Sequence, residues 1–288
     1  MTDNYVQRFL LDELDIRGAV VRLGSVWQQL LTRRSYPAPV IELLGQMSAT
    51  TLLLADNLKQ PGRLTIQLRG DGPVPLLVID CNEALNIRCM AQHSEEIRPA
   101  SLIELLGRGQ LLLSLDLPSM RQPYQSFVPL VGDSIAEIFE NYLKQSEQLA
   151  ARLFLAASPS GTSGLFLQKM PSTDQRNADG WTRIEALAST VRPEELLDLP
   201  GEEVLTRLFH EETVRLFDKK AVTGHSPEVR EKVGNMLLSL GREEVYAALR
   251  ERGEIVIRDD LGNREYRFDK AAIDELFSNT PDTPPSLH

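Results

Sequence analysis

The residues best suited to chemistry in this chain are two cysteines. Cys81 and Cys89 could form a redox pair if their strands brought them together. With a tight turn near residues 82–83, Cys81 would face residues 84–86, and Cys89 would lie several residues further along the ladder. At about 3.3 Å per residue this separation is roughly 10 Å or more, beyond the ~7 Å Cα limit for a disulfide. Buried structural thiols are the better interpretation, and two cysteines exclude a disulfide framework or a four-cysteine metal site.

The histidines and acidic clusters give weaker signals. His210-Glu211-Glu212 could be a metal or acid–base cluster, but adjacent helical residues point in different directions, which favours a solvated helix end. Asp259-Asp260 could be paired carboxylates, although surface charge beside a hairpin turn explains them more simply. The sequence contains no nucleophile elbow, dinucleotide fingerprint, Walker loop or His-Glu-x-x-His motif. We therefore expect a protein that is not an enzyme.

Composition narrows the classes of partner. The net charge is −10, from 31 basic and 41 acidic residues, which argues against a nucleic-acid or anionic-membrane partner. No apolar run approaches the roughly 18–20 residues that a membrane span needs, and the N-terminal residues lack the pattern of a signal peptide. We expect a cytoplasmic protein, and a hydrophobic content of 42% is ordinary for one with a core.

The element around which the chain is organised is the stretch from Leu64 to Ile79. Apolar and polar residues alternate from Leu64 to Arg69, which is typical of a strand with one buried face. Gly70-Asp71-Gly72-Pro73 is a turn signal, and Pro73 suits the start of a second strand. A glycine loop could instead cradle a phosphate, but no Gly-Lys-Ser/Thr follows it. The pattern favours a β-hairpin.

The same reasoning assigns the remaining elements up to residue 175. Helices are expected from residue 25, over 40–58 and 101–106, and from 134 to about 146. Further strands are expected within 4–23 and at 84–92, 110–117, 123–131, 152–157 and 165–170. The predicted fold class is α+β: a mostly antiparallel sheet core domain with packed helices, a helical linker and a small α/β C-terminal domain.

A shift in composition predicts the domain boundaries. The density of charged residues nearly doubles after residue 175, beside the polar 172–180 loop. We expect a core domain at 1–175, a helical linker at 176–218, a C-terminal domain at 219–280 and a disordered tail at 281–288. In the C-terminal domain, helices at 227–240 and 242–252 precede a hairpin that pairs Ile255 and Ile257 with Tyr266 and Phe268.

The linker is predicted to form three short amphipathic helices separated by prolines. Short helices of this kind are not stable alone, so each must dock its apolar face on another part of the protein. The residues of these apolar faces are Trp181, Ile184, Leu187, Val191, Leu196, Leu197, Val204, Leu205, Leu208 and Phe209.

Several motifs, spread nearly end to end, carry a family resemblance. They are Tyr36-Pro37-x-Pro39-Val40, Leu58-Lys59 with Gly62, Gln67-Leu68-x-Gly70-Asp71-Gly72-Pro73, Gly132-x-x-Ile135-Ala136 with Tyr142, Ser146-Glu147-Gln148, Leu167-Gln168-x-Met170-Pro171, Glu194-Glu195-Leu196-Leu197 and Arg207-Leu208-x-His210-Glu211-Glu212. In this order and spacing the chain resembles the HslO family of redox-regulated holdase chaperones, the thirty-three-kilodalton heat-shock proteins.

The chain departs from this family in its C-terminal domain. The family carries a Cys-x-Cys and a Cys-x-x-Cys there, which bind zinc when reduced and form disulfides when oxidised. The region of the first pair, residues 222–228, holds His225 but no cysteine, and the second pair falls on Asp259 and Gly262. His225 and Asp259 supply at most a fragment of a tetrahedral zinc site. We therefore expect no zinc cofactor and no disulfide trigger, with hydrophobic burial replacing the metal.

The resemblance implies an ATP-independent holdase that binds unfolded or partly folded client proteins and is a homodimer when active. Our hypothesis is that the ten apolar linker residues face the core at rest, and that heat or another stress releases them to clients. Alternatively, these residues only fill the core. A second class of function is a dedicated interaction module for one partner, on the same fold but without general holdase activity.

Overall fold

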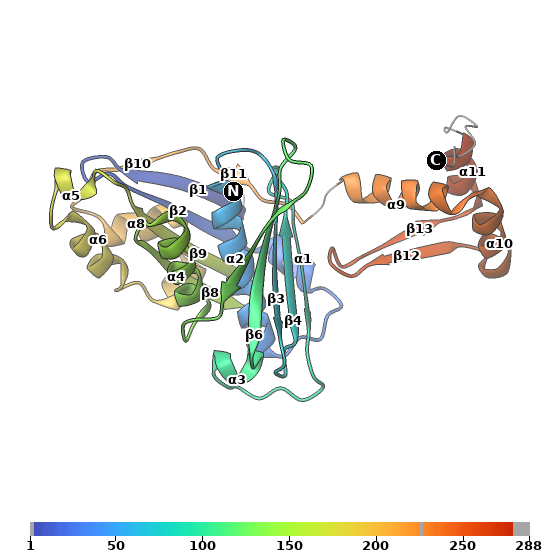
Figure 1. The fold of residues 1–288 in the computed structure, drawn as a ribbon, viewed down its shortest axis with the longest axis horizontal. Coiled ribbons are helices and arrows are strands. Elements are labelled where there is room, and N and C mark those ends of the chain that lie inside the picture. Colours follow the sequence, from blue (N-terminus) through green and yellow to red (C-terminus); the bar gives the residue numbers. More distant parts are fainter. Residues whose placement is uncertain (1–2, 225–226, 279–288) are drawn as a thin grey trace. The chain divides into compact units, whose positions relative to one another are not determined.

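The computed structural model describes residues 3–224 and 227–278. The chain forms two compact units, residues 1–224 and 225–288, and each unit has its own hydrophobic core. The first unit contains two antiparallel sheets, and the second contains one hairpin with helices (Figure 1).

The first sheet of unit 1 has six strands in the order β10-β1-β2-β9-β8, with β11 also paired to β1. The strands are β1 (Asn4–Leu11), β2 (Ile16–Leu23), β8 (Ala151–Ser158), β9 (Gly161–Lys169), β10 (Val214–Leu216) and β11 (Lys220–Ala221). β9 is buried along almost its whole length because both faces of this sheet are covered. One face meets a long helix, and the other meets the predicted linker.

The second sheet confirms the predicted hairpin. Its five strands are β3 (Arg63–Gly70), β4 (Leu76–Cys81), β5 (Ile87–Gln92), β6 (Gly109–Asp116) and β7 (Tyr124–Pro129), in the order β5-β4-β3-β6-β7. Ile66 pairs with Ile79, and the turn closes where the Gly70 N–H donates to the Pro75 carbonyl at 3.0 Å.

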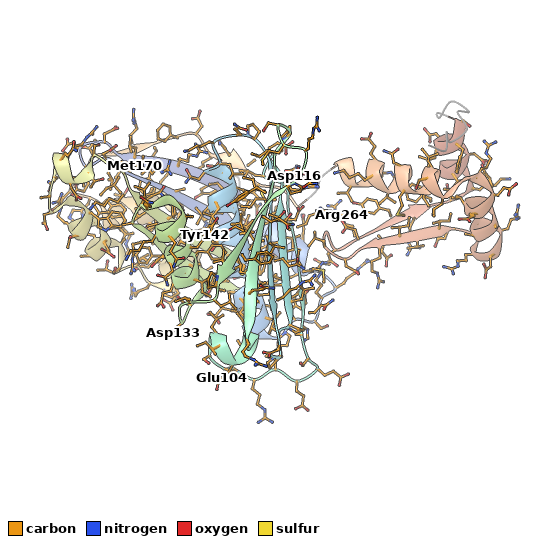
Figure 2. All side chains as sticks on the ribbon, viewed as in Figure 1. Glu104, Asp116, Asp133, Tyr142, Met170 and Arg264 are labelled. Atoms are coloured by element: carbon orange, nitrogen blue, oxygen red, sulfur yellow. The ribbon has the colours of Figure 1, made fainter. Side chains whose placement is uncertain are left out.

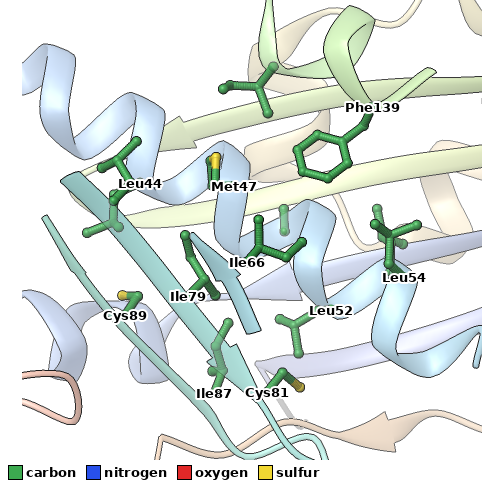
Figure 3. Packing of buried hydrophobic residues seen from close by; sticks show 14 of the residues in the cluster. Leu44, Met47, Leu52, Leu54, Ile66, Ile79, Cys81, Ile87, Cys89 and Phe139 are labelled. Carbon is green, nitrogen blue, oxygen red and sulfur yellow. The ribbon is translucent and has the colours of Figure 1, made fainter. Parts of the chain in front are cut away.

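Helix α2 (Ala38–Asp56) lies at the centre of unit 1 and packs against strands of both sheets. Leu44, Met47 and Leu52 of this helix face Ile66 and other core residues (Figure 3). The expectation that no apolar run is long enough to span a membrane was wrong for α2, which passes by length and composition. Its burial inside the unit identifies it as a core helix, and the side chains around it fill the layers of the fold (Figure 2).

Three other helices complete this half of unit 1: α1 (Ser25–Leu31), α3 (Leu102–Leu106) and α4 (Ile135–Glu147). Ser101 caps α3 through a reciprocal capping box with Glu104, and Ser134 caps α4 by accepting from the Glu137 N–H.

The predicted linker forms α5 (Thr173–Arg176), α6 (Gly180–Ala188), α7 (Pro193–Asp198) and α8 (Gly201–Leu208). These helices belong to the compact unit 1–224, as do β10 and β11, which pair with β1. The division of the chain into core, linker and C-terminal domains stays a prediction. Figure 1 shows α6 and α8 beside the first sheet.

Unit 2 contains α9 (Pro227–Leu240), α10 (Arg242–Arg252), β12 (Ile255–Asp259), β13 (Arg264–Phe268) and α11 (Lys270–Ser278). The predicted register is confirmed, because Ile255 pairs with Phe268 and Ile257 with Tyr266. Its small core gathers Val229, Leu237, Val245, Leu249, Tyr266, Phe268 and Ile273. With these two units the α+β fold class is confirmed.

Candidate functional site

All ten apolar linker residues lie in one hydrophobic cluster. Six are buried: Ile184, Leu196, Val204, Leu205, Leu208 and Phe209. The other four, Trp181, Leu187, Val191 and Leu197, are partly buried against the same cluster. The helical spacing in the sequence therefore located one apolar surface. We refer to the layer of α6, α7 and α8 with their connections as the linker layer.

The sheet face under the linker layer was not among the candidate residues. It consists of Phe9, Leu11, Ile16, Val20, Ala156, Leu165 and Leu167, with Leu14 from the β1–β2 turn. The available signal was the apolar run of β9, since strands buried on both faces lose the alternation that marks a single buried face. Releasing the linker layer would expose this face as well as the layer's own apolar side.

Two polar contacts, one partly buried and one buried, fix α7 and α8 on the sheet. The Arg22 guanidinium donates to the backbone carbonyls of Leu197, at 2.8 Å, and of Leu199. Leu197 lies in the last turn of α7 and Leu199 is its C-cap residue, and carbonyls at a helix C-terminus have no partner within the helix. At the start of α8, the Gly201 N–H donates to the Tyr5 hydroxyl at 3.0 Å. Side chains of β1 and β2 thus satisfy both ends of the α7–α8 connection.

Ion pairs at the surface of the linker layer add little. Arg183 pairs with Glu212 at 2.8 Å, Arg207 with Glu195 at 2.9 Å, and Lys219 with Glu202 at 2.8 Å. The basic partner of each pair is at least partly exposed, and ion pairs near the surface contribute about 0–1 kcal/mol each. The hydrophobic cluster carries most of the free energy that holds the layer down.

One partly buried ion network joins the linker layer to the core. Glu140 of α4 accepts from the Leu153 N–H at 2.7 Å and from the Arg152 guanidinium at 2.9 Å. The same Arg152 reaches Glu185 of α6 at 3.2 Å. Burial raises the pKa of Glu140 above its ordinary value of 4.5, against the lowering effect of these hydrogen bonds.

This raised pKa sets a pH dependence. A carboxyl whose pKa is higher in the folded protein binds its proton more tightly there, so its contribution to stability falls as pH rises above about 4.5, the unfolded value. We expect the free energy of unfolding of wild type, relative to Glu140→Gln, to decrease with pH across this window. Urea denaturation of both proteins from pH 4.5 to 7 checks this, and a parallel pH dependence in the two would contradict it.

The cysteines lie in the first hydrophobic cluster, on β4 and β5 (Figure 3). The predicted pairing of Cys81 with residues 84–86 was wrong. The connection between the strands is longer, so Cys81 pairs with Ile87 and Cys89 with Ile79. This diagonal offset of two residues corresponds to about 7–8 Å, still too far for a disulfide. Both thiols are free and buried, and burial raises the pKa of Cys89 to about 11 and that of Cys81 still further.

The other candidate clusters do not assemble into sites. His210 and Glu211 are exposed and 3.8 Å apart, and the described residues contain no group of three or more His, Cys, Asp or Glu side chains able to hold a metal ion. Asp259 and Gly262 lie at the β12–β13 turn, where the Asp259 carboxylate accepts from the Gly262 N–H at 3.0 Å. Residue His225 lies outside the described residues.

The glycine turn does not cradle a phosphate. Its N–H groups at Gly70, Asp71, Gly72 and Val74 all donate to backbone carbonyls, of Pro75, Arg108, Leu106 and Leu105 respectively. The Asp71 carboxylate accepts from the Arg108 N–H at 2.6 Å, and this bond lowers the pKa of Asp71. The turn is thus a structural joint between the hairpin and the end of α3.

A cavity of about 440 Å³ lies between the end of α2 and the first sheet. At its rim Arg8 and Lys220 both pair with the buried Asp56, at 2.5 and 2.6 Å. These charges stabilise one another. The inner wall is apolar, with Phe9, Leu53 and Phe166.

The fold and the site define a class of protein: an α+β protein in which a helical layer covers an apolar sheet face. Comparison with known proteins identifies the family. The model of the Hsp33 protein family matches residues 4–269, so the chain belongs to the Hsp33 family. By this membership it is a chaperone.

Relatives and a solved structure agree with this assignment. The chain is 41% identical over 277 residues to the 33 kDa chaperonin of Methylobacillus flagellatus, covering 96% of this chain and 94% of the relative. It is 42% identical over 296 residues to the 33 kDa chaperonin of Pseudomonas fluorescens strain Pf-5, covering 99% and 98%. The crystal structure of the 33 kDa chaperonin from Thermotoga maritima has the same fold, with a TM-score of 0.74 at 21% identity over 96% of this chain and 98% of that chain.

Proposed function

We propose that this chaperone is an ATP-independent holdase that binds unfolding proteins through the ten apolar residues of the linker layer and prevents their aggregation. The observation that carries the proposal is the single cluster in which these residues cover an apolar sheet face. Short helices held mainly by one hydrophobic cluster, with a few polar contacts, are drawn from the low-stability part of a fold, so moderate stress releases them first.

The trigger in this proposal is stress acting on the linker layer, not zinc release or disulfide formation. The two cysteines of the chain are buried in the first cluster, and burial raises the pKa of both thiols, so little of the reactive thiolate forms. The positions that match the family's second cysteine pair are Asp259 and Gly262, which do not supply the thiolates that a structural zinc site favours. We therefore propose that no zinc is bound.

The remaining parts of the proposal concern assembly and location. We propose a homodimer in the active state and a cytoplasmic protein that works without nucleic acid or membrane. The buried position of α2 supports this location, because the one helix apolar enough to span a bilayer among the described residues is used for the core.

Light scattering of a thermally unfolding client tests the function. We expect equal suppression of aggregation by the protein kept reduced, by the protein treated with peroxide, and by a Cys81→Ala/Cys89→Ala variant. Protection that needs peroxide and disappears in the double variant would contradict the proposed trigger. If none of the three samples protects the general client, but the protein protects one specific partner, the dedicated interaction module would be favoured.

A further inference from the structure

The cavity between the end of α2 and the first sheet is not filled by the linker layer. Val6, Ala19 and Phe166 line this cavity and belong to the first hydrophobic cluster, on the face of the sheet opposite the linker layer. Its volume of about 440 Å³ lies within the range of pockets that hold small organic ligands, roughly 300–1,000 Å³. The cavity is therefore large enough for a ligand of its own.

The inner wall of the cavity is mostly apolar. Besides these three residues it includes Leu53 from the last turn of α2, and all four side chains are buried. Strand β2 contributes the two small residues Gly18 and Ala19, so room remains between the sheet and the end of the helix. Burial of an aliphatic chain against such a wall is favourable, because apolar surface leaves water.

The charged part of the lining has an excess of positive charge. It contains the basic residues Arg8, Arg17 and Lys220 and the acidic residues Asp56 and Asp218, which leaves one positive charge in a chain of net charge −10. The Asp56 side chain is 3% exposed and pairs with both Arg8, at 2.5 Å, and Lys220, at 2.6 Å. Two basic groups thus converge on one carboxylate, and one further negative charge would balance the lining.

Arg8 and Lys220 can bind a second anion while they pair with Asp56. The two ion pairs use the Nε atom of Arg8 and the Nζ atom of Lys220. A guanidinium group has five N–H donors and an ammonium group has three, so neither group spends all its donors on Asp56. Their side chains are 42% and 54% exposed, so part of each charged group is accessible at the rim. A ligand carboxylate there would accept charge-assisted hydrogen bonds from both.

From this arrangement we infer that the cavity binds a small amphipathic carboxylate of the medium-chain fatty acid class. The acyl chain lies against Leu53 and Phe166, and the carboxylate lies at the rim between Arg8 and Lys220. A cationic amphiphile of the same length would bring its charge next to these two basic groups, so repulsion disfavours it. The chemistry of the lining thus selects both the chain and the charge of the ligand.

The ligand would also contact the segment that follows the linker layer. Phe217, Asp218 and Lys220 line the cavity, and the Phe217 N–H donates to the Arg8 carbonyl at 3.0 Å, which joins this segment to β1. A ligand that contacts α2, β1 and this segment together stabilises their resting arrangement by mass action. This consequence rests on the proposed function: the bound ligand would delay release of the linker layer.

Isothermal titration calorimetry of the full chain tests the site, at a temperature where the chaperone is inactive. Decanoate is the probe, and decylammonium is the matched probe of opposite charge. We expect one decanoate per chain with a dissociation constant below about 1 mM, and decylammonium at least about tenfold weaker. General binding to an acidic chain would give the reverse order, because the net charge of −10 attracts cations.

Three variants locate the bound decanoate. Ala19→Leu fills part of the cavity, and we expect it to weaken binding about tenfold or more. Lys220→Gln removes one basic group from the rim, and we expect a loss of about three- to tenfold. Lys219→Gln is the matched control, because the neighbouring Lys219 pairs with Glu202 and does not line the cavity, and we expect the wild-type constant. Circular dichroism confirms that the variants fold.

The effect on the chaperone is measured by light scattering of the thermally unfolding client. At ten times its dissociation constant, decanoate should raise the temperature at which protection begins by about 3–6 °C. The Ala19→Leu variant should show no such shift, which separates this effect from any action of decanoate on the client itself.

The possible failures are distinguishable. Absence of saturable decanoate binding overturns the inference, and so does equal binding in the wild type and in Ala19→Leu, which would place decanoate on another surface. Equal affinity for decylammonium overturns the assigned role of Arg8 and Lys220. Binding at the cavity without a shift in the onset of protection overturns the link to the linker layer. A chain that binds decanoate but protects no client overturns the proposed function, while the ligand site stands.

Discussion

Replacement of Phe209 by alanine is expected to switch this chaperone on at temperatures where the wild type is inactive. Phe209 is 1% exposed, and its ring lies 6.3 Å, centroid to centroid, from that of Phe9 on the sheet. Truncation of a buried phenylalanine costs about 3–5 kcal/mol. Because this contact joins the linker layer to the sheet, most of the cost weakens the docking of the layer on the sheet. The population of molecules with an undocked linker layer therefore rises about a hundredfold or more.

Two measurements check this expectation. The first is suppression of client aggregation at a temperature where the wild type gives none. The second is limited proteolysis, with cleavage expected to increase within residues 176–213. Phe139→Ala is the matched control, because Phe139 is 0% exposed but belongs to the first cluster, on α4. We expect this control to destabilise unit 1 without selective cleavage of the linker layer.

A Phe209→Ala variant that is cleaved in the linker layer but protects no client would separate release from function. The ten apolar residues would then be core filler, as the alternative interpretation of the sequence holds. Equal activation by Phe139→Ala would show that general unfolding of unit 1, not release of the linker layer, exposes the binding surface.

The part of this site that the sequence revealed is the part encoded locally. Apolar residues spaced at three and four positions marked one face of each linker helix, and all ten belong to one cluster. The sheet face beneath them depends on which strands become neighbours. β2 pairs with β9 across more than a hundred residues, and nothing in the spacing of Ile16 or Leu165 indicates that pairing.

The cysteine register shows the same limit at shorter range. The apolar pattern located both strands, but Asn82 accepts from the N–H groups of Ala84 and Asn86 and so holds a longer loop than the tight turn expected. The β4–β5 register therefore differs from the predicted one, but the two cysteines are still not paired opposite each other. Side-chain hydrogen bonds of this kind compete with tight turns and are difficult to foresee from sequence.

The sequence predicted the hairpin turn at residues 70–73, but not the glycine from another part of the chain that packs against it. Gly107, which ends α3, packs against the turn with a φ of +66°. A Cβ at residue 107 would meet the Asp71 carboxylate and would lie 2.6 Å from the Gly72 nitrogen. The sequence predicted a helix over 101–106, but nothing in it indicated that Gly107, the next residue, contacts the turn, because this contact is long-range.

We expect Gly107→Ala to be among the most destabilising single substitutions in unit 1. The positive φ costs about 1–2 kcal/mol for a residue with a Cβ, and the crowding against backbone adds about 1–3 kcal/mol. Gly161→Ala is the matched control, since residue 161 has no positive φ and its added Cβ would lie 3.0 Å from the Leu23 carbonyl oxygen. A cost of about 1 kcal/mol or less is expected there.

Urea denaturation followed by tryptophan fluorescence measures both variants. The chain has two tryptophans, and Trp181 lies in the linker layer, so a Trp181→Phe background leaves the buried Trp27 as the reporter of the core. We expect the Gly107→Ala midpoint to fall well below that of Gly161→Ala, with an unchanged slope. Equal midpoints would mean that α3 can move away from the turn at little cost. The Gly-Asp-Gly-Pro signature would then need an explanation other than this joint.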